Sequence, residues 1–281
     1  MNSISTQEVA SIFSSFHIPA KPQILTEIQA ELDKLEPDIM AIADLITQDV
    51  GLSAAILKII NSPAYGMCRT ISEIKQAVMM LGLKSVNSLV TGVMLKGAFQ
   101  DTGCITLERF WDESYELACA MNFIGDRVKN RIPVEMLFTV GLFLECGIPV
   151  LAQKYSDYKE VLMEANAKGI SPIELEEKRY QTNHAILGYF VASSWHLPKN
   201  ICNLILRQHD YDFLSKHSGS EEELMFSVLK ASENMLQMAK RQTLSPDWNE
   251  IGGDVLDILG ITASDYQDVV DIFTDQLMEA V

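Results

Sequence analysis

The sequence predicts an all-α protein with two helical lobes, and three observations support this. Apolar residues recur every three to four positions along most of the 281 residues, which is the period of an amphipathic helix. No segment alternates apolar and polar residues in the way a half-buried strand does. Clusters of Gly, Pro, Asn, Ser and Asp separate the apolar segments, and we find neither a long repeat nor a low-complexity tract.

Composition narrows the functional classes. The chain is 48% apolar and 21% charged, which is ordinary for a globular protein. A net charge of −16 argues against a nucleic-acid partner, because binding a phosphate backbone requires a basic face. The N-terminus has no signal-peptide pattern, and the apolar run 136–152 contains Glu145, Gly and Pro, so we expect no membrane segment. Five dispersed cysteines fit reduced thiols, so we expect a cytoplasmic protein without disulfides or structural zinc.

A polar turn over residues 100–103 divides the chain into an expected first lobe, 1–103, and a second lobe, 104–281. In the first lobe, Ser5 and Glu8 form a capping box, and Asp38 can cap the helix that follows it. Pro63 disfavours helical geometry at the residue before it, and Gly82 occupies the place of a left-handed C-cap. The expected helices cover residues 3–16, 24–35, 39–48, 49–60, 71–81 and 84–95.

The second lobe carries helix boundaries of the same kinds. Gly147-Ile148-Pro149 is expected to break a helix that Pro133 opens, and Gly169 to end another. Ser171-Pro172-Ile173-Glu174 has the pattern of a helix start, and Ser264 with Gln267 of a capped last helix. The expected helices cover residues 110–128, 133–146, 158–168, 171 onward, 183–195, 198–208, 223–242 and 264–281.

One stretch resembles the signature of a known family. Residues 49–82 read D-V-G-L-S-A-A-I-L-K-I-I-N-S-P-A-Y-G-M-C-R-T-I-S-E-I-K-Q-A-V-M-M-L-G. The Asp-x-x-Leu-Ser helix, the Asn-Ser-x-x-Tyr-Gly loop and the Ala-Val-x-x-Leu-Gly helix are similar to those of the HDOD family. Val50 departs from the pattern, which usually has Pro there. The resemblance covers roughly residues 18–210 and implies a bacterial signal-transduction module whose second lobe is related to the HD phosphohydrolases.

The resemblance also assigns positions to a site. An active HD enzyme has a His, an adjacent His-Asp pair and a later Asp, which hold metal ions that generate hydroxide. The segment F-W-D-E-S of this protein places Glu113 at the first His, and G-L-F-L-E-C-G places Leu144 and Glu145 at the pair. The segment A-S-E-N places Ser232 at the last Asp. Because Leu144 cannot bind a metal and Ser232 is a poor ligand, we expect no catalytic residue, no metal and no cofactor.

Two sets of residues leave alternatives open. His184 and His209 match histidines common in the family, and with Glu113 and Glu145 they either form a residual polar site or are separate, satisfied polar groups. In the signature loop, side chains either hydrogen-bond and anchor the backbone or form a ligand or partner surface that faces the second lobe. The loop residues are Asn61, Ser62, Tyr65 and Gly66.

The expected function is that of a non-catalytic bacterial regulatory module, which acts through a protein partner or a small ligand held between its lobes. One alternative is a metal-dependent phosphohydrolase of the phosphodiesterase type with a rearranged HD site. Another is a nucleotide or cyclic-dinucleotide sensor, for which Arg69 and Arg207 could supply local positive charge. The sequence indicates no oligomeric state.

Overall fold

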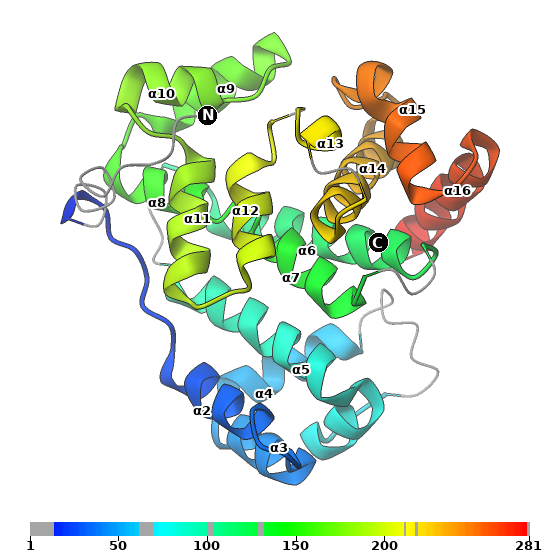
Figure 1. Ribbon diagram of the computed structural model, residues 1–281. Coiled ribbons are helices and arrows are strands. Elements are labelled where there is room, and N and C mark those ends of the chain that lie inside the picture. Colours follow the sequence, from blue (N-terminus) through cyan, green and yellow to red (C-terminus); the bar gives the residue numbers. More distant parts are fainter. Residues whose placement is uncertain are drawn as a thin grey trace.

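Helices make up all the regular structure in the part of the chain that the computed structural model describes. That part comprises residues 14–61, 70–99, 104–128, 132–210, 212–216 and 219–279. The all-α prediction is confirmed, and Figure 1 shows the helices in two groups joined through α5 and α7.

The first group contains four helices, and the predicted cap at Asp38 is confirmed, whereas the predicted capping box of Ser5 and Glu8 lies outside the described residues. Asp38 accepts hydrogen bonds from the backbone N–H of Met40 and Ala41, and Asp49 accepts one from Leu52. Gly82 has the predicted positive φ (77°), but its ψ of 162° makes it a kink inside one long helix and not a helical end. The helices are α2 (Gln23–Leu32), α3 (Ile39–Gln48), α4 (Val50–Ile60) and α5 (Ile74–Ala98).

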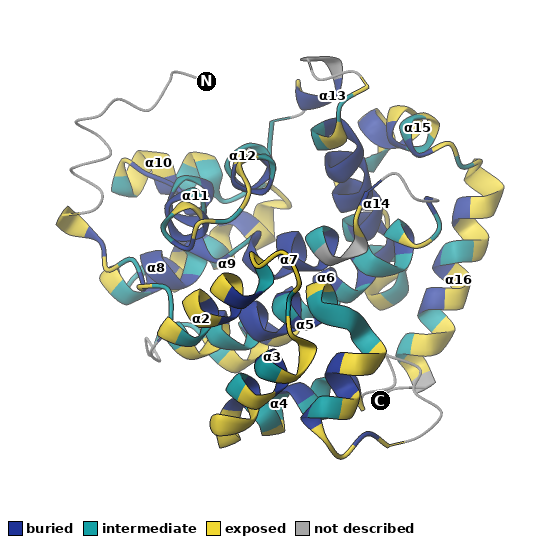
Figure 2. Ribbon diagram, turned by 60° about the horizontal axis from the view of Figure 1, so that its bottom comes forward, coloured by how far each residue is buried: buried dark blue, intermediate teal, exposed yellow. Residues whose placement is uncertain are grey.

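The second group is built around the pair α6 and α7, with α8–α12 on one side and α14–α16 on the other (Figure 1). Buried residues lie on the inward faces of α7 and α14, whereas α16 is exposed along much of its length (Figure 2). The helices are α6 (Leu107–Gly125), α7 (Val134–Phe143), α8 (Gly147–Lys154), α9 (Tyr158–Lys168), α10 (Ile173–Tyr180), α11 (His184–Ser194), α12 (Lys199–Arg207), α13 (Phe213–Lys216), α14 (Glu221–Arg241), α15 (Trp248–Leu259) and α16 (Ala263–Glu279).

The helix start predicted at Ser171-Pro172 agrees with the structure within one residue. Helix α10 begins at Ile173, Pro172 already has helical φ and ψ (−68° and −13°), and Ser171 Oγ accepts from the Ile173 N–H at 3.4 Å.

Two other predicted boundaries in this group are wrong. The chain turns at 144–146, and Gly147 begins α8 instead of breaking a helix; Pro149 is tolerated because the first turn needs no amide donors. Thr262 and Asp265, not Ser264, form the capping box of α16. Helix α15 was not predicted.

Two glycines allow close helix packing that positions the site. A Cβ on Gly141 would lie 2.5 Å from the Cα of Ala118, so α6 and α7 approach along their backbones. A Cβ on Gly147 would lie 1.9 Å from the carbonyl oxygen of His184, so α8 begins directly against α11. A side chain at either position would force the two helices apart.

The lobes are also linked outside the helices. The indole N–H of Trp195, at the end of α11, donates a hydrogen bond of 2.9 Å to the carbonyl of Pro19. The segment that leads into α2 is therefore fastened to the second group. The predicted lobe boundary near residue 104 adjoins residues 100–103, which lie outside the described residues, and it stays a prediction.

Two segments are long and apolar enough to cross a membrane by length and composition alone. They are Ile74–Ala98, with a mean hydropathy of 1.5, and Met136–Lys154, with 1.7; the bent pair α3 and α4 would make a third. Within the fold, 44% and 78% of their windows are buried. Packing against neighbouring helices therefore accounts for much of the apolar character of the second segment.

Candidate functional site

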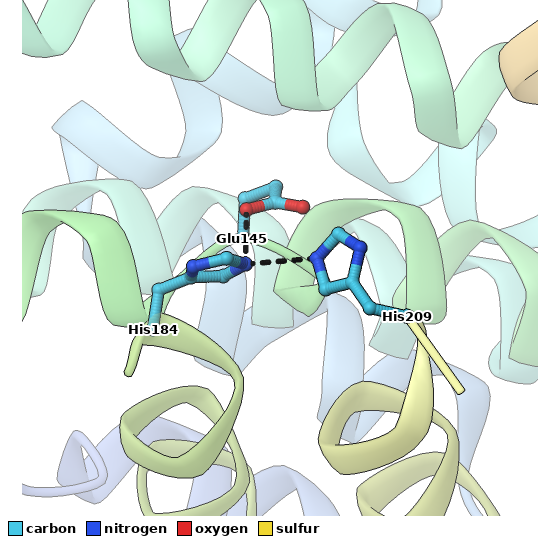
Figure 3. A group of neighbouring side chains, drawn as sticks. All are labelled: Glu145, His184 and His209. Atoms are coloured by element: carbon cyan, nitrogen blue, oxygen red, sulfur yellow. Dashed lines mark hydrogen bonds and ion pairs between the residues drawn. The ribbon is translucent and has the colours of Figure 1, made fainter. Parts of the chain in front are cut away.

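Three of the predicted polar residues meet in the second lobe. Glu145 lies in the turn between α7 and α8, His184 is the first residue of α11, and His209 follows α12 (Figure 3). His184 Nε2 is 3.3 Å from Glu145 Oε2 and 3.1 Å from His209 Nε2. One ligand atom from each residue lies within 4.8 Å of the others. The residual polar site suggested by the sequence is thus a real convergence of these three side chains.

The surrounding backbone holds the cluster together. The side-chain amide of Gln208 donates a hydrogen bond of 3.1 Å to the carbonyl of Leu144, which fastens the Glu145 turn to the end of α12 beside His209. Asn183 caps α11 by accepting from the N–H of Ile186 at 2.9 Å, and this sets the orientation of the first turn.

A buried carboxylate behind His184 fixes its tautomer. Glu176 Oε2 lies 2.8 Å from His184 Nδ1 and accepts a second hydrogen bond, of 2.9 Å, from the His184 backbone N–H. The hydroxyl of Tyr158 donates to the other oxygen of Glu176. His184 is 1% exposed and Glu176 is 0% exposed. Because a carboxylate only accepts, Nδ1 carries the proton, and Nε2 is the atom that faces Glu145 and His209.

The charges in the cluster are strongly coupled. Burial opposes the charged form of His184, but the carboxylates of Glu145 and Glu176 outweigh it and raise its pKa. Burial, together with His184 and Lys230, lowers the pKa of His209 to about 2, so this imidazole is neutral. Burial raises the pKa of Glu145. Burial also works against ionisation of Glu176, but the hydrogen bonds from His184 and Tyr158 more than offset it and lower its pKa.

The remaining predicted HD positions do not join the cluster. Glu113 has an exposed side chain on α6 and pairs with Arg109 at 2.9 Å. The side chain of Leu144 is fully buried. Ser232 is also fully buried, and its hydroxyl donates to the carbonyl of Val228 in its own helix at 2.7 Å.

A cavity of about 340 Å³ adjoins the cluster, and we call it the acidic cavity. Glu145 lines it and so connects it to the histidines, and Glu113 is also among its lining residues. Four carboxylates line the cavity against two basic side chains: Glu113, Glu116, Glu145 and Glu233 against Lys240 and Arg241. The wall of this cavity therefore carries an excess of negative charge.

Several residues of the site were missed by sequence reasoning. Glu176 lies in an acidic segment of α10, and helical periodicity alone does not distinguish its buried position from the exposed Glu174 and Glu177. On α14 the acidic residue beside the cluster is Glu233, next to the predicted Ser232, and it pairs with the buried Lys230 at 2.9 Å. Glu176 stands in no motif, whereas Glu233 lies inside the A-S-E-N segment, where the motif pointed to its neighbour Ser232.

In the signature loop, only Asn61 lies within the described residues. Its amide nitrogen donates to the carbonyl of Ile71 and its amide oxygen accepts from the N–H of Ile71, both at 2.7 Å. These bonds tie the end of α4 to the segment before α5, which favours the structural interpretation for this residue. The other loop residues named above, Ser62, Tyr65, Gly66 and Arg69, lie outside the described residues. Arg207 forms an ion pair of 2.8 Å with Asp210.

The donor set of the cluster suits a metal ion. One carboxylate and two imidazoles are the ligands of many zinc and iron sites in proteins. The carboxylate of Glu176 on the far nitrogen of His184 is the outer partner that a metal-binding histidine normally has. These residues therefore fit a metal ion, although three of the four HD positions (Glu113, Leu144 and Ser232) do not contribute.

Comparison with known proteins agrees with the fold. A model of the HDOD domain matches residues 18–211. An uncharacterized protein of Treponema pallidum (strain Nichols) is 27% identical over 227 residues, which are 80% of this chain and 43% of that protein. YuxH, an uncharacterized protein of Bacillus subtilis (strain 168), is 31% identical over 83 residues, which are 30% of this chain and 18% of YuxH. The chain thus spans less than half the length of either relative.

Solved structures share the fold at low sequence identity. An HDOD domain protein of unknown function from Geobacter sulfurreducens superimposes with a TM-score of 0.72 at 22% identity, over 98% of this chain and 94% of that one. A phosphohydrolase candidate from Shewanella amazonensis SB2B gives 0.70 at 18% identity, over 96% and 94%. A signal-transduction candidate from Marinobacter aquaeolei VT8 gives 0.71 at 17%, over 93% and 58%. The match of the family model over most of the length shows that the chain belongs to the HDOD domain family.

Proposed function

We propose that this chain is a signal-transduction module that acts by binding a protein partner or a small ligand, and that it does not hydrolyse phosphoesters. The fully buried side chain of Leu144, at the position of the HD histidine, is the observation that carries this proposal. Ser232 supports it, because its hydroxyl is satisfied inside its own helix. Without ligands at these two positions the chain lacks half of the HD metal-binding set.

The charge of the acidic cavity supports the same proposal. A phosphoester that approached Glu145 through this cavity would meet four carboxylates and only two basic groups. Lys240 is moreover engaged by Glu116. Phosphate-binding sites concentrate positive charge or backbone N–H groups, and the lining of this cavity does the opposite.

The test of the non-catalytic proposal is a turnover assay. We expect purified protein supplied with Mn²⁺, Fe²⁺, Zn²⁺ or Mg²⁺ to hydrolyse bis(p-nitrophenyl) phosphate no faster than a Glu145→Ala/His184→Ala double variant does. Hydrolysis by the wild type that disappears in the double variant would overturn the proposal.

A metal-dependent phosphohydrolase with a rearranged site is the second candidate function. The convergence of Glu145, His184 and His209 favours it, since a metal held there could activate water. In that reaction Glu176 would orient His184, and the three side chains would hold the ion that supplies hydroxide. The same turnover assay separates the two candidates.

A small ligand has a suitable place between the lobes. A cavity of about 550 Å³, which we call the interlobe cavity, is lined by α2, α5, α7 and the turn between α11 and α12. Its volume is in the range of small-molecule sites. Its charged lining residues are Lys21 and Lys84 against the single carboxylate of Asp33, and Asn87 and His196 add polar groups among apolar walls, which favours an anionic ligand such as a nucleotide.

The ligand proposal can be tested by thermal unfolding. We expect at least one member of a panel of nucleotides and cyclic dinucleotides to raise Tm, and Lys84→Glu to abolish the shift. Lys159→Glu, an exposed change on α9, should leave it intact. If no nucleotide changes Tm, or if Lys84→Glu has no effect, the nucleotide-sensor proposal fails and a protein partner remains as the proposed mode of action.

The environment and partners of the module are proposed from the sequence. A net charge of −16 supports a function without nucleic acid, and the dispersed cysteines support a reducing, cytoplasmic environment without membrane attachment. Binding to DNA fragments or to lipid vesicles at physiological salt would contradict this part of the proposal.

A further inference from the structure

We propose that Glu145, His184 and His209 bind one divalent first-row transition-metal ion, through a carboxylate oxygen and the two Nε2 atoms. This site shares only Glu145 with the four positions of the HD set, since Glu113, Leu144 and Ser232 lie elsewhere or are apolar. Metal binding here requires no hydrolysis, so it goes beyond the proposed signalling function and does not depend on it.

Two of the three distances within the cluster match those between ligands of one ion, and the third is at most 4.8 Å. Zinc bonds of about 2.0–2.1 Å to nitrogen and oxygen make the edges of a coordination tetrahedron about 3.3–3.4 Å long. The Glu145 Oε2–His184 Nε2 distance is 3.3 Å, and the distance between the two Nε2 atoms is 3.1 Å. The two distances are therefore those expected for atoms that bind one ion in common.

Orientation of His184 also fits a metal ligand. Its Nδ1–H donates to Glu176, so the lone pair of Nε2 is directed away from Glu176 toward Glu145 and His209. Tyr158 in turn holds Glu176. Such outer partners fix the ring of a metal-binding histidine, and their loss commonly lowers metal affinity. Glu176 is therefore a positioning residue for the proposed ion.

The carboxylates of Glu145 and Glu176 both lie against the ring of His184, whose side chain is 1% exposed. Lys230 is nearby, but Glu233 and Asp247 engage its ammonium at 2.9 and 3.5 Å. Uncompensated buried charge is costly, and one divalent ion would neutralise both carboxylates.

A proton on His184 Nε2 is the competing occupant. It could be shared with His209 across the 3.1 Å contact, as in an ordinary hydrogen bond between an imidazolium and an imidazole. A single proton carries one positive charge against two carboxylates. It would leave Glu145 Oε2 with its 3.3 Å contact to His184 Nε2 instead of a bond to a metal ion. The metal and the proton therefore make different predictions for stoichiometry and for the effect of added ions.

Three protein ligands leave a coordination position for water or a small ligand. Because Glu145 lines the acidic cavity, solvent can reach the cluster from that side. No other group of three such ligands was found in the described residues. The donor set excludes the hard ions Mg²⁺ and Ca²⁺ as the preferred occupants, since these favour oxygen ligands alone.

The experiment measures metal bound per chain. The full-length protein is stripped with a chelator, reloaded with Zn²⁺, dialysed against metal-free buffer and analysed for elements. We expect about one Zn²⁺ per wild-type chain, and less than about a tenth of that in His209→Gln and Glu145→Gln. Wild-type protein that retains no zinc, or variants that retain as much as wild type, would overturn the proposal and leave the proton as the occupant.

Matched controls separate this site from incidental binding. Glu113→Ala removes another carboxylate of the acidic cavity, and His17→Ala removes an exposed histidine; both should keep the full equivalent. Loss of zinc in these controls would show that binding is not specific to the cluster. A rise in Tm on adding Zn²⁺ in wild type, absent in His209→Gln, adds a readout that also shows both proteins are folded.

Glu176→Gln tests the positioning role. Glutamine keeps a similar volume and an acceptor for His184 Nδ1, but it removes the charge. We expect zinc affinity, measured by competition with a chromophoric chelator, to fall roughly 10- to 100-fold. An unchanged affinity would remove Glu176 from the proposed site.

Failure of this proposal is distinguishable from failure of the proposed function. Zinc-loaded protein that does not hydrolyse bis(p-nitrophenyl) phosphate supports both proposals. Zinc binding accompanied by hydrolysis that depends on Glu145 would overturn only the non-catalytic function. Absence of zinc binding would overturn only the metal site.

Discussion

The two sides of the candidate site are built in opposite ways. On the side of α7 and α14, the two positions that the resemblance assigns to HD ligands lie in the core: Leu144 is fully buried, and Ser232 bonds within its own helix. On the side of α10 to α12, polar side chains remain buried and bonded to one another, with Glu176 supporting His184 and His184 contacting His209. Burying an apolar side chain favours folding, whereas burying a cluster of ionisable side chains carries a desolvation cost, so the second side is where we seek a function.

Among the variants that test this comparison, Glu176→Ala should cause the largest loss of stability. It would leave His184 Nδ1, the His184 backbone N–H and the Tyr158 hydroxyl without their acceptor in a fully buried position. We expect the free energy of unfolding of chelator-treated protein to fall by about 3–5 kcal/mol in urea titrations.

Glu174→Ala is the matched control for that variant, because Glu174 lies exposed on the same helix. Its effect should stay within about 0.5 kcal/mol. If Glu176→Ala lowers the free energy of unfolding no more than Glu174→Ala does, the buried polar side chains do not stabilise one another. The contrast between the two sides of the site would then be wrong.

Leu144→Ala tests the apolar side. Removing three carbons from a fully buried side chain should lower the free energy of unfolding by about 3 kcal/mol through lost burial and the space left behind. Zinc stoichiometry should not change, because Leu144 contributes no ligand atom. Leu35→Ala, at a fully exposed side chain, is the control for urea unfolding. A small loss of stability together with a loss of zinc would place Leu144 on the functional side instead.

Gly147→Ala tests how closely the two sides must approach. The added methyl would collide with the backbone of His184 and push α8, with the preceding Glu145 turn, away from α11. We expect a loss of about 2–3 kcal/mol and weaker zinc binding. Gly97→Ala on α5 is the control, because its Cβ would meet nothing within 4 Å and should stabilise the helix by about 0.5–1 kcal/mol. Unchanged zinc affinity in Gly147→Ala would show that this contact does not position the cluster.

How far the sequence predicts this molecule depends on how local each signal is. Helix α9 and its left-handed Gly169, the Asp38 cap and the family signature are short-range patterns, and all were predicted. Position 147 was misread as a break because the close packing of α8 on α11 depends on residues 37 positions apart, which no local pattern encodes.

The candidate site follows the same rule. The alignment with HD motifs identified Glu145, and the two family histidines were recognised, but their convergence depends on three different helices meeting. Glu176 was missed because nothing in its own segment marks it as the partner of His184, which lies beyond the intervening turn. Glu113 was included on the motif alone, and its pairing with Arg109 on the exposed face of α6 favours the second alternative, a separate and satisfied polar group.

Ser232→Ala should change the free energy of unfolding least, because Ser232 lies on the side of the site whose polar groups are satisfied within one helix. The Ser232 hydroxyl donates to the Val228 carbonyl, which is four residues earlier in the same helix and so already accepts the backbone N–H of Ser232. Removing the hydroxyl leaves no buried group without a partner, and alanine favours the helix. We therefore expect a change of less than about 0.5 kcal/mol in urea unfolding and no change in zinc stoichiometry. A loss of zinc in this variant would mean that the helix α14 position of the HD set still contributes a ligand, and the two sides would then be one site.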